Sequence, residues 1–307
     1  MTYSQPAQIL EKIKSAQNIL VNCHKSPDVD SISSALSMCQ ALVKMGKKVS
    51  VISPDAPLPE LSFLPCFENI KVIDYANFDF KQYDLFVVLD SANNEVVTGS
   101  KTNMLPNMPT LVIDHHRQNT NFGEINLVDP ERSATAELLY LLFQDWGITV
   151  DKDLSTTLLT GILGDTGAFE FHNTTPRTLQ VAADLMLKGA NKDELLVKIF
   201  RSRSIDLLKF WGYALDKMQL DPSGKFTWIA VPYSVFENLG KPQKASSVTS
   251  NLFSRMVDGT KFGIVMVEES PNFLKVSLRS REDFDVSKIA TSLGGGGHEE
   301  ASAVVIV

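Results

Sequence analysis

Acidic and histidine side chains follow an apolar run at four places in the sequence. Ile19–Cys23 leads into His24, Asp28 and Asp30, Leu85–Leu89 into Asp90, Leu111–Ile113 into Asp114, His115 and His116, and Gly161–Gly164 into Asp165. In open parallel sheets, ligands bind beyond the carboxyl ends of the strands, so polar residues that follow apolar strands should gather there. Two carboxylates about 4 Å apart repel by about 4 kcal/mol at an effective dielectric of 20, so such a cluster needs positive charge.

Divalent cations would supply that charge. Carboxylates with a minority of imidazoles suit Mn or Mg better than structural zinc, which favours thiolates. At least four carboxylates and two imidazoles exceed the needs of one octahedral ion, so the pattern predicts two cations that share a carboxylate. Such a pair, about 3.5–4 Å apart, activates a bridging water and neutralises charge on a phosphoryl group. Each acidic residue alone would pass for an ordinary loop residue.

The elements that must position these residues alternate between strand and helix through the first half of the chain. A helix is predicted at Ser31–Met45, ended by Gly46, and the segment Ala134–Leu187 is wholly helical, with Thr175 as a helix N-cap and Pro176 after it. Apolar runs rich in β-branched residues predict strands at Ile19–Cys23, Val49–Ser53, Lys71–Ile73, Asp84–Leu89, Thr110–Ile113 and Ile125–Val128. This alternation predicts an α/β domain with a parallel sheet flanked by helices.

The rest of the chain predicts a smaller α+β domain across a cleft from the first. A charged helical stretch, Lys192–Lys217, leads to the turn residues Asp221–Gly224. After this turn come predicted strands at Phe226–Val231, Lys261–Glu268, Phe273–Leu278 and Ala301–Val307 and helices at Tyr233–Leu239, Lys244–Met256 and Asp285–Leu293. We therefore expect a first domain at 1–190, a helical linker at 191–224 and a second domain at 225–307.

Composition limits the possible classes of protein. The 307 residues suffice for two domains with cores of their own. With 29 basic and 36 acidic residues, the formal charge of -7 argues against binding long duplex nucleic acid. No apolar run approaches the ~20 residues of a membrane helix, so no membrane partner is expected. Three cysteines without CxxC spacing, and no secretion signal, favour reduced thiols in the cytoplasm.

The motifs together resemble the DHH phosphoesterase family with its C-terminal DHH-associated domain. They are His24–Asp30, Asp90, Asp114–His116, Asp165 and Gly294–His298, in that order. The compact two-domain form is similar to the family's nanoRNase-type oligoribonucleases and pAp phosphatases. The resemblance implies a Mn-dependent phosphoesterase, with Mg as the other metal, that cuts short RNA oligonucleotides from an end and also takes the nucleotide pAp. A homodimer is implied only by this likeness.

The resemblance also implies a role for each motif residue. His24, Asp28 and Asp90 would bind one metal, and Asp30, Asp90, His115 and Asp165 the other, with Asp90 as the bridge. His116 would donate a hydrogen bond to the scissile phosphate, and Asp114 would orient a histidine of its own triplet. In the second domain, the substrate's terminal nucleotide would be held by Arg279, Gly295, Gly296, Gly297 and His298.

Two segments depart from the family pattern. Ala168 and Glu170 stand where many relatives have arginine, which removes positive charge near the phosphate. Ser133–Glu137 resembles a family helix start in which Thr135 is expected to act as a cap. Two alternatives stay open: a phosphodiesterase acting on cyclic dinucleotides or pApA, and a non-catalytic nucleotide-binding protein of the same fold.

Overall fold

The computed structural model describes residues 5–102, 104–201, 203–281, 284–297 and 299–307. The predicted site residue His298 lies outside these ranges. The chain divides into two compact units, Met1–Ser202 and Arg203–Val307. Each unit has its own sheet and its own buried core.

The sheet of the first unit is parallel throughout, as predicted, with the order β3-β2-β1-β4-β5-β6. The strands are β1 (Asn18–Asn22), β2 (Lys48–Ser53), β3 (Ile70–Val72), β4 (Leu85–Leu89), β5 (Thr110–Asp114) and β6 (Ile125–Val128). The connections run outward in opposite directions from the neighbouring strands β1 and β4. This topological switch point is where α/β sheets of this kind bind ligands, beyond the carboxyl ends of the strands.

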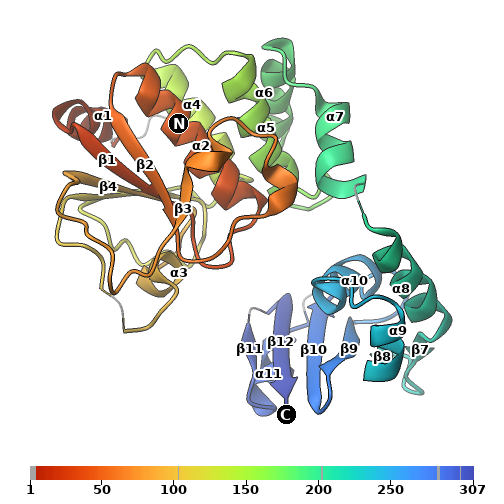
Figure 1. Ribbon diagram of the computed structural model, residues 1–307. Coiled ribbons are helices and arrows are strands. Elements are labelled where there is room, and N and C mark those ends of the chain that lie inside the picture. Colours follow the sequence, from red (N-terminus) through yellow and green to blue (C-terminus); the bar gives the residue numbers. More distant parts are fainter. Residues whose placement is uncertain (1–4, 103, 202, 282–283, 298) are drawn as a thin grey trace. The chain divides into compact units, whose positions relative to one another are not determined.

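Helices cover one face of this sheet, as Figure 1 shows. They are α1 (Pro6–Ser15), α2 (Val29–Lys44), α4 (Thr135–Asp145), α5 (Lys152–Asp165) and α6 (Pro176–Leu187). The helical segment Ala134–Leu187 thus forms three helices, and Thr175 caps α6 through a reciprocal bond with Thr178, as predicted for the cap. Side chains alternate along β1: Ile19 and Val21 enter the helix-covered core, whereas Leu20 faces the opposite layer.

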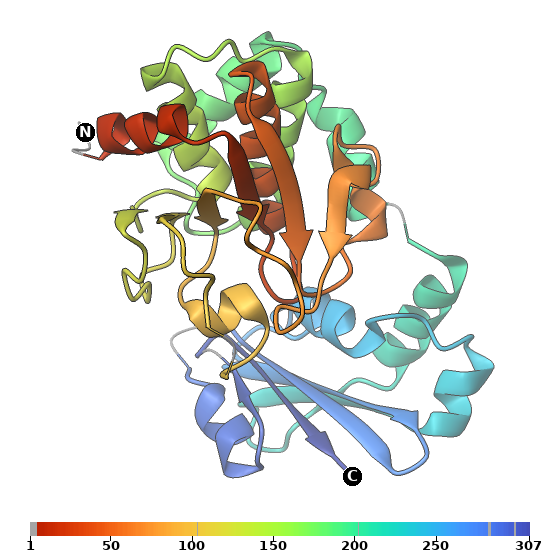
Figure 2. The ribbon, with the colours of Figure 1, turned by 60° about the vertical axis from the view of Figure 1, so that its left-hand side comes forward.

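The opposite layer is thinner. It consists of the short helix α3 (Asn94–Thr98) and connecting loops such as the one around Tyr75 (Figure 2). The 3-10 turns η1 (Pro59–Leu61) and η2 (Phe67–Asn69) pack on the helix-covered side instead, where Leu61 is buried. Tyr75 and Val97 from this layer pack on Leu20, Phe86 and Val88 of the sheet. Both faces of β1 and β4 are therefore buried, which explains their continuous apolar sequences.

The second unit is an α+β sheet domain, as predicted. Its sheet has the order β11-β12-β10-β9-β8-β7, and only the β8–β9 pair is parallel. The strands are β7 (Gln219–Leu220), β8 (Phe226–Val231), β9 (Phe262–Ser270), β10 (Phe273–Ser280), β11 (Gly296–Gly297) and β12 (Ala301–Ile306). The helices are α8 (Ile205–Asp216), α9 (Tyr233–Asn238), α10 (Ala245–Phe253) and α11 (Ser287–Ser292).

The segment expected as a helical linker, 191–224, contributes to both cores. The helix α7 (Lys192–Leu196) and the π-helical turn η3 (Val197–Arg201) place Leu195 and Ile199 in the core of the first unit. Phe210 of α8 belongs to the core of the second unit. The turn Asp221–Gly224 joins β7 to β8 as a hairpin, and Gly224 takes its left-handed conformation with φ at +70°.

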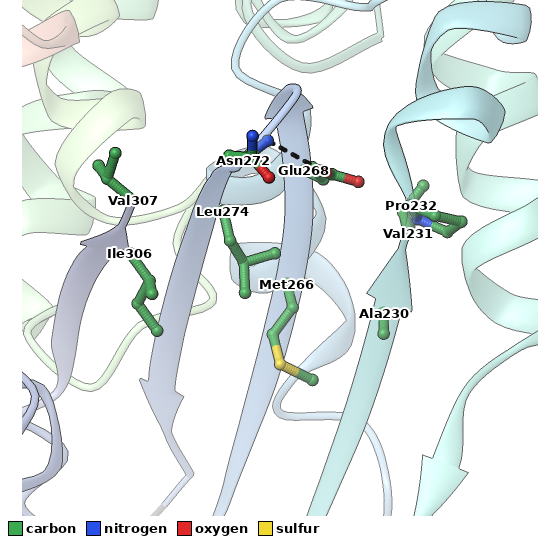
Figure 3. Close-up of a pocket in the computed structure, with 9 residues that line it drawn as sticks. All are labelled: Ala230, Val231, Pro232, Met266, Glu268, Asn272, Leu274, Ile306 and Val307. Atoms are coloured by element: carbon green, nitrogen blue, oxygen red, sulfur yellow. Dashed lines mark hydrogen bonds between the residues drawn. The ribbon is translucent and has the colours of Figure 1, made fainter.

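One end of the second unit's sheet carries an apolar hollow of about 470 Å³. Figure 3 shows Met266, Leu274 and Ile306 on three strands of this surface, beside the chain end at Val307. The hollow contains none of the site residues predicted from the sequence that the structure describes.

Candidate metal centre

His24, Asp28 and Asp90 come together at the carboxyl ends of β1 and β4. The Nε2 atom of His24 lies 3.7 Å from Oδ2 of Asp28 and 3.5 Å from Oδ2 of Asp90. Asp28 is the N-cap of α2, where its Oδ1 accepts a bond from the Ser31 amide and Oδ2 is left for the cluster. His24 and Asp28 thus both lie in the loop between β1 and α2. These three residues could hold one metal ion.

Asp30, His115 and Asp165 form a second group of potential ligands. Nε2 of His115 lies 3.1 Å from Oδ2 of Asp165 and 3.5 Å from Oδ1 of Asp90. Asp30 is fully buried in the first turn of α2, and His115 directly follows β5. Two groups with Asp90 between them are the arrangement expected for two cations.

Asp90 faces both groups with different oxygens. Its Oδ2 lies toward His24, and its Oδ1 lies toward His115. The residue is 1% exposed, and its backbone has a φ of +53°. A left-handed conformation is costly for a residue with a Cβ atom and is found most often at functional sites. The amide of Asp90 donates to the carbonyl of Ile113 on the neighbouring strand, which helps to hold this conformation.

Asp165 reaches the cluster from a helix, whereas His24, Asp90 and His115 follow strands. The apolar run Gly161–Gly164 is the last turn of α5, within the segment predicted to be helical, and Asp165 is the final residue of that helix. Asp165 lies beside His115, as expected for a carboxylate of the cluster.

Two backbone carbonyls orient the two candidate metal-binding imidazoles. Nδ1 of His24 lies 2.7 Å from the carbonyl oxygen of Lys25, and Nδ1 of His115 lies 3.3 Å from that of Arg132. A hydrogen bond from Nδ1 to a carbonyl leaves Nε2 for a metal ion, which is the usual arrangement of metal-bound histidine. In both residues Nε2 is the atom that faces the carboxylates.

His116 is held by Asp114 rather than by the carboxylates of the cluster. Oδ1 of the buried Asp114 lies 2.8 Å from Nδ1 of His116, and its Oδ2 accepts a bond from the Asn119 side chain at 2.6 Å. His116 is the more exposed of the pair, with 41% of its side chain accessible. Nδ1 of His116 also lies 3.6 Å from Oδ1 of Asp90, so this imidazole stands next to the bridge.

The charges of the cluster favour cations. Burial raises the pKa of Asp30 well above its usual range, and the neighbouring Asp90 and Asp165 raise it further. Burial alone would lower the pKa of His24, but its bonds to Asp28 and Asp90 outweigh that and raise it to about 11. Negative charge therefore exceeds what the imidazoles can balance. Oxygen and imidazole donors around such excess charge fit divalent cations of the Mn or Mg type.

The supporting roles of two side chains were not predicted from the sequence. Asn119 binds Asp114, and Thr135 donates a hydrogen bond from Oγ1 to Oδ1 of Asp90 at 3.0 Å. Thr135 was expected to be a helix cap, but it is the first residue of α4, and its side chain points to Asp90 instead. The cap position belongs to Ala134, whose methyl group has no oxygen for the helix. A contact across 45 residues has no local pattern that could reveal it.

The predicted substrate residues that the structure describes lie in the second unit. Arg279 of β10 donates through Nε to Oδ1 of Asn251 at 2.5 Å. Burial and the like charge of Arg255 lower the pKa of Arg279 to about 10. Gly295 and Gly297 pack against the backbone of β12, where a Cβ atom would collide, whereas Gly296 has open space around it within the described part of the chain. Part of the predicted loop is thus the strand β11, paired with β12.

Comparison with known proteins agrees with this fold and cluster. Residues 18–162 match the DHH family, N-terminal domain, and residues 232–307 match the DHHA1 domain. The chain belongs to the DHH family. It is 30% identical to the bifunctional oligoribonuclease and PAP phosphatase NrnA of Thermus thermophilus, over 98% of this chain and 87% of that protein.

The chain is also similar to a longer phosphodiesterase and to a solved structure. The cyclic-di-AMP phosphodiesterase PdeA of Listeria monocytogenes is 28% identical over 94% of this chain, which spans 44% of that longer protein. A crystal structure of an exopolyphosphatase-related protein from Bacteroides fragilis has a TM-score of 0.90 at 24% identity, covering 99% of this chain and 92% of that one. At that identity the likeness establishes the fold. Among the described residues, no helix is both long and apolar enough to cross a membrane.

Proposed function

We propose that this chain is a metal-dependent phosphoesterase that hydrolyses short oligoribonucleotides and removes the 3′-phosphate of pAp. The observation that carries the proposal is the position of Asp90, whose two carboxylate oxygens face two separate groups of potential metal ligands. The similarity to an oligoribonuclease and PAP phosphatase over nearly the whole chain supports the substrate class.

In this proposal His24, Asp28 and Asp90 hold one cation, and Asp30, Asp90, His115 and Asp165 hold the other. Their oxygen and imidazole donors suit Mn, with Mg as the other metal that such a site accepts. When bound, the two cations lower the pKa of a water molecule and offset the charge that develops on the phosphoryl group. The buried position of Asp30 and Asp90 keeps bulk water from screening these charges.

His116 stabilises the phosphate in this proposal. Its Nδ1 is bound by Asp114, which leaves Nε2 as a hydrogen-bond donor for a phosphate oxygen. The bond to Asp114 and the charge of Asp90 raise the pKa of His116 against the effect of burial, which favours the protonated form of this donor. A preorganised donor of this kind lowers the barrier because it requires no reorganisation during the reaction.

The second unit holds the nucleotide end of the substrate in this proposal. Arg279 lies near the like-charged Arg255, so a phosphate would relieve their repulsion. Gly296 offers backbone that side chains do not obstruct, and His298 is the remaining candidate from the sequence. This binding role is supported by charge alone, whereas the metal roles are supported by the geometry of a whole cluster.

A phosphodiesterase that acts on cyclic di-AMP or pApA is the second candidate function. It is favoured by the similarity to PdeA over 94% of this chain. A non-catalytic nucleotide-binding protein is less favoured, because each of the six expected metal ligands belongs to one of the two groups.

The deciding experiment compares the wild type with Asp90→Asn on pApA, pAp, a long oligoribonucleotide and cyclic di-AMP, with Mn or Mg. Asparagine tolerates the left-handed backbone of Asp90, so the fold should be retained while the bridging charge is lost. We expect hydrolysis of pApA and pAp by the wild type and none by the variant. Asp258→Asn, at a fully exposed carboxylate of the second unit, should behave like the wild type.

Three outcomes would count against the proposal. An Asp90→Asn variant with wild-type turnover would refute the bridging role. Turnover of cyclic di-AMP or pApA without any turnover of pAp would favour the second candidate. Binding of substrate without any turnover at saturating Mn would favour the non-catalytic alternative. A cytoplasmic location and a homodimer stay predictions, and the molar mass of the chain in solution tests the latter.

A further inference from the structure

The N-terminus of α4 contacts the two most deeply buried carboxylates of the cluster. The amide of Thr135 donates to Oδ2 of Asp30 at 2.7 Å, and the amide of Ala136 donates to Oδ1 of Asp30 at 3.1 Å. The hydroxyl of Thr135 donates to Oδ1 of Asp90 at 3.0 Å. One end of a helix of 11 residues thus binds a carboxylate from each of two other elements.

Asp30 replaces the cap that α4 lacks in its own sequence. The first amides of a helix need acceptors, and a serine, threonine or aspartate at the N-cap usually supplies one. Ala134 occupies that position here, and Asp30 from α2 accepts the bonds instead. The positive end of the helix dipole also offsets part of the negative charge of Asp30. Oδ1 of Asp30 also accepts a bond from the Ser34 hydroxyl at 3.2 Å, so Oδ2 is the oxygen that keeps a further lone pair for a cation.

The hydroxyl of Thr135 acts on a different property, the orientation of the Asp90 carboxylate. The terminal torsion of an aspartate side chain is broad, so the backbone alone leaves the carboxylate plane free to rotate. The Thr135 bond selects one oxygen, Oδ1, and this is the oxygen that faces His115. Oδ2 is thereby directed toward His24. The division of the two oxygens between the two groups depends on this orientation.

A buried acidic residue anchors the first turn of α4 and with it Thr135. Glu137 is fully buried and accepts bonds from the amide and the hydroxyl of Ser133 and from the hydroxyl of Thr178. Its other oxygen accepts a bond from the Arg132 guanidinium at 3.2 Å. Four donors around one carboxylate fix the position of the turn that carries Thr135.

We propose that Thr135 is a positioning residue whose hydroxyl orients the Asp90 carboxylate so that each oxygen serves one of the two metal sites. This inference rests on the proposed function, since it assumes that Asp90 bridges two cations. It goes beyond that function by assigning the bridge geometry to a side chain that is not itself a ligand.

The test compares Thr135→Val, which keeps the shape and removes the hydroxyl, with Thr135→Ser, which keeps the hydroxyl. Mn binding to the full-length chain is titrated by calorimetry, and kcat and KM are measured on pApA. Loss of a group that orients a ligand typically costs about 10–100-fold in metal affinity or activity. We expect a loss of that size in Mn affinity and in kcat for Thr135→Val, an unchanged KM, and recovery to within a few-fold in Thr135→Ser.

Thr160→Val is the matched control. Thr160 is fully buried in α5, and its hydroxyl donates to the carbonyl of Thr156 in its own helix. The control therefore loses a buried hydroxyl without touching the cluster, and its Mn affinity should equal that of the wild type. Thr135→Ala, measured in parallel, provides a variant without a hydroxyl that cannot overpack the site.

The outcomes separate this inference from the proposed function. Wild-type Mn affinity in both Thr135→Val and Thr135→Ala would overturn the inference. An equal loss in Thr135→Ser and Thr135→Val would also overturn it, because the hydroxyl would then be irrelevant. If the wild type itself bound no Mn and hydrolysed no substrate, the proposed function would fail before Thr135 was tested.

Discussion

At the residue scale, the site depends on where the oxygens of a few carboxylates point. Asp28 and Asp30 are two residues apart, yet Asp28 caps its own helix while Asp30 caps α4. Both were predicted as metal ligands from the strand-end pattern and the family resemblance, and both lie in the groups of potential ligands. The sequence contains no information about the direction of a carboxylate, because direction comes from donors such as Thr135 that are remote in the chain.

The His116–Asp114 pair permits a prediction at this scale. His116→Gln should lower kcat by about 10²–10³-fold, as the loss of one donor to a charged transition state typically does, and leave Mn binding unchanged. Asp114→Asn should show the same pattern, because the imidazole then loses the acceptor that orients it. The double variant should lose little more than either single variant, since the two residues act as a unit.

Steady-state kinetics on pApA and Mn calorimetry provide the two measurements. The control is His172→Gln, because His172 is an exposed histidine outside both groups of potential ligands and outside the overlapping set Asp90, His115 and His116, within the described residues. His116 lies close enough to Asp90 and His115 to serve as a metal ligand with them. A large fall in Mn affinity in His116→Gln would show that this imidazole does bind a metal ion.

At the element scale, most strands and helices were predictable from apolar periodicity and from capping and stop residues. The strands β6 and β8 have the predicted bounds, and β1 differs by one residue at each end. The run before Asp165 is continuously apolar although it is helical, as predicted, because α5 packs closely against α2 and little of this run meets solvent.

Two glycines allow this close packing of α5 against α2 and so place Asp165. A Cβ atom on Gly161 would lie 2.6 Å from Oδ1 of Asp30, and one on Gly164 would lie 2.5 Å from Cβ of Val29. Both distances are too short for real atoms, so either substitution must push the helices apart. The separation of α2 and α5 sets the distance between the carboxylates that the two helices carry.

Gly164→Ala is therefore expected to destabilise the chain and weaken the second metal site. Overpacking of this kind costs about 1–3 kcal/mol, and each kcal/mol lowers the Tm by about 2–4 °C in a unit of this size. Mn affinity should fall as well, because Asp165 moves relative to His115. Thermal unfolding and Mn calorimetry on the same samples give both quantities.

The control for this prediction is the same substitution in a helix with space. Gly212 lies inside α8, and within the described residues a Cβ atom there would meet open space. Gly212→Ala should raise the stability of the second unit by about 0.5–1 kcal/mol through helix propensity. A Gly164→Ala variant with the Tm and Mn affinity of the wild type would contradict the packing argument.

At the scale of the whole molecule, the candidate residues for metal binding and for nucleotide binding lie in different units. The first unit contains the entire candidate metal cluster, and the second contains Arg279 and the described glycines of the predicted nucleotide site. The sequence predicted two domains because each half has its own apolar pattern. The sequence did not show that α8 packs in the core of the second unit. A helix between two domains has the same spacing of apolar residues whichever of the two cores it joins.

Arg279→Gln tests this separation of roles. A hydrogen bond to a charged group is worth about 1.5–3 kcal/mol, which corresponds to a rise in KM for pApA of about 10–100-fold. The kcat at saturating substrate and the Mn affinity should stay at wild-type values, because no metal ligand is altered. Arg177→Gln, at an exposed arginine on α6, should change neither KM nor kcat. If Arg279→Gln lowered kcat while KM stayed constant, the guanidinium would act on the reacting phosphate, and the two units could not be assigned separate roles in binding and hydrolysis.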